Sequence, residues 1–175
     1  MKVTQTLAEL RNALGDANVQ AWLRVIRAGE SSPDTDEAYS ALYGWSASKG
    51  GPTFSDFSSH PRAAAMSSWG WTSAAGAYQA MATVSGKVHT DTWDNAYDWF
   101  AARNYQLTMS PADQDLFAVW CTARRGALPS VQAGLIREAM SLCNLEWASL
   151  PGSSYGQPTV AAEKLLAVYA RLGGT

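Results

Sequence analysis

Residues 20–31 of the chain read QAWLRVIRAGES, an apolar helical stripe that ends near the side-chain carboxylate of Glu30. Trp22 and Ile26 recur at helical spacing, and Asp16 or Asn18 can cap this helix. Glu30 lies four residues past Ile26 and eight past Trp22, so it falls on the apolar face. Partial burial and the negative end of the helix dipole both raise the pKa of such a carboxyl. A protonated Glu suits a general acid for glycosidic cleavage, although a carboxyl that rotates into water at a frayed helix end is the structural alternative.

The composition excludes several partners. The chain has 175 residues, a formal net charge of −2, 47% hydrophobic residues and 16% charged residues. It can build a sizeable core, and it carries neither a basic stripe for nucleic acid nor a Lys/Arg-rich face for a membrane surface. Eight tryptophans are unusual. We expect core positions for those in helical segments (Trp22, Trp93, Trp99 and Trp120) and positions flanking a groove for those in loops (Trp45, Trp69 and Trp71).

Hydrophobic periodicity and capping residues predict a mainly helical chain with one irregular insertion. The expected helices are residues 7–14, a second ending at residue 30, 92–105, 111–125, one capped by Ser130 with Leu135 and Leu142 on its apolar face, and 158–173. Residues 31–60 are irregular and should hold a small hairpin region with a strand at 38–44, and the chain should return to helices after Ser73. No linker is long enough to separate domains, so residues 1–175 are expected to form one domain.

The ends of the sequence and the two cysteines give little indication of targeting, disulfide bonding or metal binding. No apolar signal-peptide region and no stretch long enough for a membrane span is visible. We therefore expect synthesis in the cytoplasm without membrane insertion. Cys121 and Cys143 lie in helical segments without metal-ligand spacing, and we interpret them as buried free thiols, a single bridge being the alternative. With only His60 and His89 in the chain, no metal site is expected.

Six blocks, in the order of the chain, resemble the lambda-type phage endolysins of the lysozyme superfamily. They are RAGES at 27–31, FSDFSSHPR at 54–62, SAAGAYQ at 73–79, SPADQD at 110–115, RGALP at 125–129 and WASLPGSSYGQ at 147–157. The resemblance covers residues 22–157 and implies a lysozyme-like α+β fold, mainly α, with two lobes, a small β-hairpin region and a groove between the lobes. It makes residues 1–175 a single lysozyme-like catalytic domain.

The resemblance also implies an activity, cleavage of the β-1,4 bond between N-acetylmuramic acid and N-acetylglucosamine by lytic transglycosylation. Glu30 matches the family's catalytic acid. The muramyl C6 hydroxyl attacks its own anomeric carbon and gives a 1,6-anhydro product, so neither a nucleophilic carboxylate nor a cofactor is required. The residues alone leave two alternatives open: a hydrolytic muramidase in which Asp56 assists water, and a catalytically inactive saccharide-binding module.

The resemblance further places Gln79 in the sugar groove, where its amide can donate and accept hydrogen bonds. The candidate substrate-binding residues are Ser31, Tyr39, Asp56, His60, Tyr78, Gln79, Tyr155 and Gln157. Simpler interpretations are a capping role for Ser31, a core position for Tyr78, a helix-surface position for Gln79 and a turn-capping role for Asp56. His60 is interpreted first as a hydrogen-bonding turn residue and second as a wall-binding residue.

Three departures from the family pattern affect the groove. Ser40 follows Tyr39 where the family often has Asp, and Ala77 stands where an arginine is common. Residues 79–93 look longer than in the family, which can reshape one lip of the groove. The resemblance implies a monomer whose partner is the glycan strand of peptidoglycan. It also implies a Gram-negative host and action in the periplasm after a holin has opened the membrane.

Overall fold

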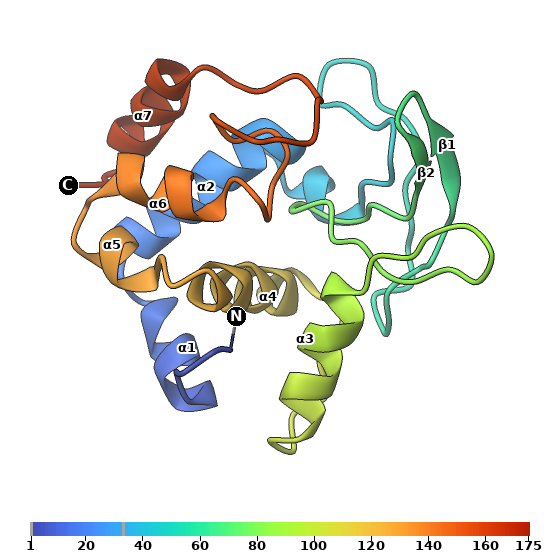
Figure 1. Ribbon diagram of the computed structural model, residues 1–175, viewed down its shortest axis with the longest axis horizontal. Helices are drawn as coiled ribbons and strands as arrows, with labels where there is room; N and C mark the ends of the chain where they lie inside the picture. The colour runs from blue at the N-terminus through green and yellow to red at the C-terminus, as the bar shows by residue number, and fades with distance from the viewer. Residues whose placement is uncertain (1, 33) are drawn as a thin grey trace.

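The computed structural model describes residues 2–32 and 34–175, and Figure 1 shows helices gathered on one side and a hairpin on the other. The helical side contains α1 (Leu7–Ala13), α2 (Ala17–Glu30), α5 (Leu128–Gln132), α6 (Ile136–Cys143) and α7 (Ala162–Arg171). The hairpin consists of β1 (Ala65–Ser67) and β2 (Gly70–Thr72), which pair antiparallel. Between them lie α4 (Pro111–Arg124) and α3 (Thr92–Ala101). The mainly α, lysozyme-like α+β fold predicted from the sequence is confirmed.

The first two helices begin at side-chain caps. Thr6 and Glu9 form a capping box at α1. Asp16 accepts hydrogen bonds from the backbone N–H groups of Asn18 and Val19, so it is the cap of α2. α2 buries Trp22 and Ile26 and ends at Glu30, as its apolar stripe predicts. α2 packs against α7, so the helix that carries the predicted acid rests on the last helix of the chain.

The irregular insertion differs from the prediction in where its hairpin lies. The predicted strand at 38–44 is wrong, because Thr35 caps a short 3-10 helix, η1 (Asp36–Ser40). Two acidic residues in its first turn favour that helix start, and Ala41 and Leu42 then form isolated bridges. The hairpin lies at residues 65–72 instead, where Gly70 takes a φ of +110° at the turn.

The expectation that helices resume after Ser73 is also wrong. Residues 73–91 form tight turns closed by bridges between Ala75 and Ala80 and between Val84 and Val88. Helix α3 begins at Thr92 as predicted, but it ends at Ala101 rather than at Tyr105. Glycines inside both turns have positive φ, which breaks helical geometry.

The last third of the chain corrects two helix boundaries. α4 is capped by Ser110 as predicted, but the helix predicted to follow Ser130 is split. Ser130 lies inside α5, and a turn at Gly134, with φ +73°, separates α5 from α6. Leu135 and Leu142 are consequently exposed. The buried face of α6 consists of Ile136, Ala139, Met140 and Cys143. α7 begins at Ala162, a few residues after the predicted start.

The tryptophans divide largely as expected. Trp22, Trp93 and Trp120 are buried, Trp99 and Trp45 are half-buried, and the hairpin residues Trp69 and Trp71 are 58% and 41% exposed. Trp147, in the loop after α6, is also buried. Both cysteines are buried free thiols, as predicted, and burial raises their pKa. Among the described residues, no helix is both long enough and apolar enough to cross a membrane.

Candidate active site

The carboxyl group of Glu30 closes α2 and faces a loop from the far end of the chain. Its Oε1 accepts a 2.6 Å hydrogen bond from Ser149 Oγ and a longer one of 3.4 Å from the Ser149 backbone N–H. Burial raises the pKa of Glu30, while the hydrogen bonds from Ser149 act in the opposite direction. The side chain is still partly exposed. Glu30 therefore holds its proton to higher pH than an ordinary Glu and remains reachable, as a general acid requires.

The contact between Glu30 and Ser149 depends on the absence of a side chain at Gly29. A Cβ placed on Gly29 would lie 2.2 Å from Ser149 Oγ and 2.8 Å from Ser149 Cβ. Glycine at this position thus lets the loop approach the last turn of α2. The backbone N–H of Val160 donates to the Ser149 carbonyl at 2.8 Å, which ties both limbs of the loop together.

A buried ion cluster anchors the start of the same loop. Glu146, whose side chain is 3% exposed, is paired with Arg124 at 3.0 Å and Arg125 at 2.7 Å. Arg125 also donates to the Leu145 carbonyl at 2.6 Å. Two guanidinium groups from the end of α4 therefore hold the backbone just before Ser149.

The turn at residues 76–79 lies beside the end of α2. Ser31 Oγ donates to the Ala77 carbonyl at 2.7 Å, and the Ala77 N–H donates to Gln114 Oε1 at 2.8 Å. Gly76 has φ +77°, and a Cβ there would lie 2.1 Å from Gln114 Oε1. Gln79 has φ +46° and turns its amide back to the Gly76 carbonyl at 3.0 Å. The predicted Gln79 block is thus a strained turn next to the acid, rather than a helix surface.

Two of the predicted tyrosines meet at one carboxylate. Tyr39 and Tyr78 donate to Asp115 Oδ1 at 2.7 Å and 2.5 Å, and both rings are buried. Arg27, itself buried, donates to the Tyr39 hydroxyl at 3.2 Å and lies over its ring. Burial and the charge of Asp115 raise the pKa of Tyr39 to about 12 and that of Tyr78 well above its usual value. These hydroxyls are therefore protonated donors that connect η1, the turn at 76–79 and α4.

The remaining predicted residues lie at different depths. His60 is buried: its Nε2 is 2.9 Å from the Ala80 carbonyl, and Nδ1 accepts from the Arg62 N–H, as expected for a turn residue. Asp56 is exposed and accepts from the Ser58 N–H, and the hydrogen bonds from Ser58 lower its pKa. Tyr155 and Gln157 are exposed on the loop that carries Ser149. The structure thus connects Glu30, Ser31, Tyr39, Tyr78 and Gln79 through direct contacts and shared partners, and His60 is joined to this group through Ala80. The hydrogen bond to Asp56 comes from its own turn.

Sequence reasoning gave no role to three residues that complete the site: Ser149, Gln114 and Asp115. All three lie inside sequence blocks that resemble the endolysins, so the blocks themselves were the available signal. Their roles depend on partners 37 to 119 positions away in the chain, which local patterns do not reveal.

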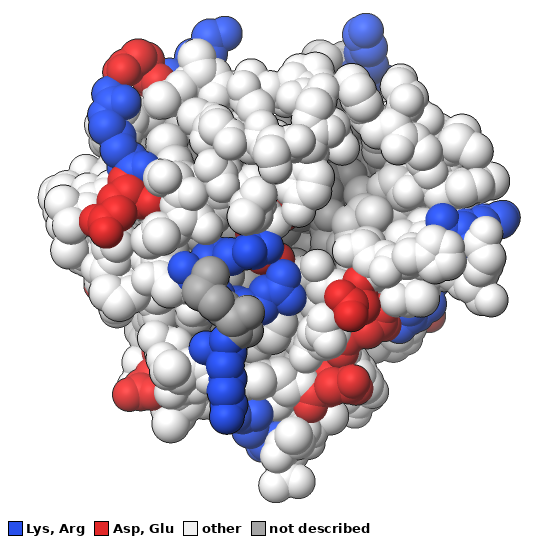
Figure 2. Space-filling view, viewed as in Figure 1, with Lys and Arg blue, Asp and Glu red and all other residues white. Residues whose placement is uncertain are grey.

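The surface around this region is uncharged and concave. Figure 2 shows a hollow between the helical side and the hairpin side, and its visible walls are mostly white, the colour of residues other than Lys, Arg, Asp and Glu. A surface of this kind suits a neutral polymer. Among the described residues, no group of three or more His, Cys, Asp and Glu could hold a metal ion.

Comparisons with known proteins agree with the fold. The Endolysin family model matches residues 20–175. The endolysin of Escherichia phage lambda is 34% identical over 137 residues, which cover 76% of this chain and 77% of that protein. The endolysin of Escherichia phage P2 is 46% identical over 65 residues, which cover 37% of this chain and 39% of that protein.

Solved structures give the same result. Bacteriophage lambda lysozyme complexed with a chitohexasaccharide matches with a TM-score of 0.74 at 29% identity, over 91% of this chain and 96% of that chain. A second structure of lysozyme from bacteriophage lambda matches with a TM-score of 0.63 at 28% identity, over 99% of both chains. The helical side, the hairpin and the acid at the end of α2 define a lysozyme-like protein. The chain belongs to the Endolysin family, the phage lysozymes that degrade peptidoglycan.

Proposed function

We propose that this endolysin cleaves the bond between N-acetylmuramic acid and N-acetylglucosamine by lytic transglycosylation. The observation that carries the proposal is the carboxyl of Glu30, which is partly exposed at the end of α2 and held by Ser149, and whose pKa is raised by burial. The protonated carboxyl donates its proton to the glycosidic oxygen as that bond breaks. The muramyl C6 hydroxyl then bonds to the anomeric carbon, and the Glu30 carboxylate takes the hydroxyl proton. The products are a 1,6-anhydromuramic end and a free N-acetylglucosamine hydroxyl.

Three other carboxylates, those of Asp34, Asp56 and Asp115, have partners of their own, which supports a mechanism with a single acid. Asp34 is exposed and paired with Arg171 at 2.9 Å. Asp56 is exposed and engaged by Ser58, and Asp115 accepts from two tyrosine hydroxyls. Glycoside hydrolysis normally uses a second carboxylate as a base or a nucleophile, whereas intramolecular attack by the C6 hydroxyl needs none.

The glycan strand is the proposed ligand of the uncharged hollow. Bacteriophage lambda lysozyme has been solved with a chitohexasaccharide, which supports an extended sugar chain as the ligand here. Within the hollow, Gln79 is proposed to exchange its hydrogen bond with the Gly76 carbonyl for bonds to the sugar. Ser31, Tyr155 and Gln157 remain proposed sugar contacts. Tyr39, Tyr78 and His60 are buried, and any effect they have on the sugar acts through the turns that they hold.

Mass spectrometry of digested peptidoglycan tests the reaction directly. We expect 1,6-anhydromuramic ends, and we expect Glu30→Gln to lower kcat by about 10²–10⁴-fold because the proton donor is lost. Asp56→Asn is the matched control and should leave both the rate and the products unchanged. Reducing muramic ends that disappear with Asp56→Asn would instead establish a hydrolytic muramidase. Unchanged lysis of outer-membrane-permeabilised cells by Glu30→Gln would remove Glu30 from the mechanism, and binding without any cleavage would show a saccharide-binding module.

A further inference from the structure

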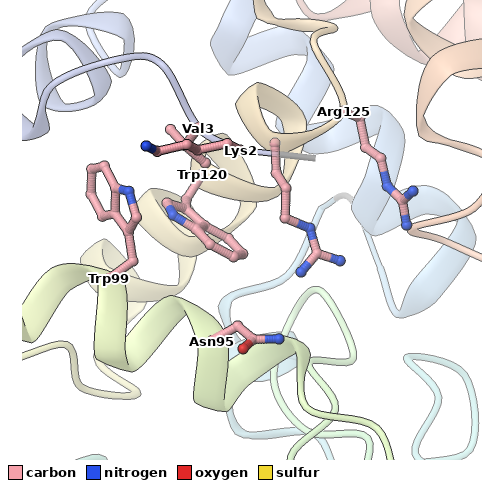
Figure 3. Close-up of a pocket in the computed structure, with 7 residues that line it drawn as sticks. Lys2, Val3, Asn95, Trp99, Trp120 and Arg125 are labelled. Atoms are coloured by element: carbon pink, nitrogen blue, oxygen red, sulfur yellow. The ribbon is translucent and has the colours of Figure 1, made fainter.

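A pocket on the helical side carries chemistry that glycan cleavage does not use. It has a volume of about 500 Å³ and lies between the N-terminal segment, α3 and the end of α4. Its lining residues are Lys2, Val3, Asn95, Trp99, Trp120, Arg124 and Arg125 (Figure 3). A volume of this size is ordinary for the binding of a small ligand.

The charges of the pocket are unbalanced. Three of its lining residues, Lys2, Arg124 and Arg125, are cations, and no lining residue is acidic. Glu146 pairs with both arginines. The three cations and this one carboxylate therefore carry a combined charge of about +2. The arginine side chains are held in place by that pairing and remain 18% and 19% exposed. The pocket is therefore preorganised for an anion.

The floor of the pocket contains a hydrogen-bond donor without an acceptor. Trp120 is 3% exposed, and its Nε1–H is the one buried side-chain polar group of the described residues that lacks a hydrogen-bond partner. Figure 3 shows the nitrogen-bearing edge of this indole turned toward Trp99, beneath Lys2 and Val3. An unpaired buried N–H is unfavourable and would be relieved by an acceptor in the pocket.

The surroundings select the kind of anion. α3 forms one wall and carries Asp98 and also Asp94, which is paired with Arg62, and Figure 2 shows acidic side chains close to basic ones on this face. A polyanion such as nucleic acid would be repelled there. A short peptide can present one of its carboxylates to the cations, and the exposed parts of the Trp99 and Trp120 indoles, each of which has a guanidinium over its ring, offer apolar surface to the neighbouring atoms.

We propose that this pocket binds a carboxylate of the peptide stems of peptidoglycan. The proposal rests on the function proposed above, since the stems are attached to the muramic acid residues of the glycan strand that is cleaved. Cations at Lys2 and Arg124 receive the carboxylate, and the Trp120 N–H donates to one of its oxygens. The pocket gives the enzyme a second contact with its substrate, away from the sugar-cleaving acid.

Nuclear magnetic resonance titration with the free stem tetrapeptide (alanine, glutamate, diaminopimelate, alanine) tests the pocket without any cleavage. The indole N–H signal of Trp120, assigned by its loss in Trp120→Phe, should shift as peptide is added. Lys2→Glu should weaken binding about tenfold, because it reverses one of the pocket cations. Lys164→Glu, the same charge change on the exposed face of α7, is the matched control and should bind as the unmodified protein does. Acetate and chitohexaose should not reproduce the shift at the same concentration.

The proposal fails if the Trp120 signal does not respond to the peptide, if acetate moves it equally, or if Lys2→Glu and Lys164→Glu weaken binding to the same degree. Lys2 is exposed at the end of the chain, so its variant tests the pocket even where Trp120→Phe does not fold. The two proposals fail separately. Absence of peptide binding with 1,6-anhydro products overturns only the pocket, whereas peptide binding with reducing-end products overturns only the transglycosylase mechanism.

Discussion

Removal of the Ser149 hydroxyl should change the pH range over which the enzyme works. Ser149 Oγ donates to Glu30 Oε1 at 2.6 Å, and such a bond favours the ionised carboxylate. A hydrogen bond to a charged group contributes about 1.5–3 kcal/mol, and one pKa unit corresponds to about 1.4 kcal/mol. In Ser149→Ala the pKa of Glu30 should therefore rise further, because burial still raises it while the side-chain hydrogen bond that lowers it is lost.

The assay is kcat/KM against pH on purified peptidoglycan. Glu30 must be protonated to act as the acid, so the alkaline limb of the profile should move to higher pH by about one unit in Ser149→Ala. Ser154→Ala, an exposed hydroxyl in the same loop, is the control and should leave the limb in place. An alkaline limb that stays fixed, or that moves to lower pH, would refute the assignment of Ser149 as the residue that tunes Glu30.

Other perturbations give independent checks. Burial raises the pKa of Glu30, so the protein should lose stability as the pH rises from the ordinary Glu value near 4.5 through the higher value of the folded protein. Glu30→Gln should therefore raise the unfolding free energy at pH 7 but not at pH 3, as measured by urea titration. Burial lowers the pKa of His60 from 6.5 to about 4, so about 3 kcal/mol of stability present above pH 6.5 should be lost as the pH falls to 4. His60→Gln should weaken this pH dependence of the unfolding free energy in the same titrations. An unchanged pH dependence would contradict the buried neutral imidazole. Gly29→Ala should lower stability by about 1–3 kcal/mol and reduce activity through its collision with Ser149, and adding Ser149→Gly should recover the melting temperature but not the normal alkaline limb. Asp115→Asn should cost about 1–3 kcal/mol in thermal unfolding because two hydroxyls lose a charged acceptor, and a variant as stable as the parent would argue against that network.

Local sequence signals were sufficient for the capped helices. Asp16 and Ser110 each place a side-chain acceptor at a helix start, and both caps form as expected. The errors fall where long-range packing or glycine geometry decides the backbone. Ser130 has the chemistry of a cap but lies within α5, because the chain actually breaks at Gly134. The turns at 73–91 are closed by bridges between small residues, which carry no helical or strand periodicity.

The same distinction between local and long-range determinants applies to the residues of the site. The position of Glu30 on the apolar stripe of one helix could be predicted from the sequence because it is a local property, whereas its proposed role as the acid came from the resemblance to the endolysins. The chemical state of that carboxyl could be predicted in direction only, since the hydrogen-bond donor that opposes burial lies 119 residues further on. The sequence shows a glycine at position 29, but only the structure shows why it is needed. A side chain at this position would collide with Ser149 in the packed loop.

The contact between Glu30 and Ser149 also concerns the synthesis of the protein. α2 packs against α7, and the bonding partner of the acid comes from the loop between α6 and α7. A chain still on the ribosome without its last quarter therefore has the acid but neither the hydroxyl that tunes it nor the helix that supports it. We therefore expect a protein truncated before residue 147 not to cut peptidoglycan, because it lacks both Ser149 and α7.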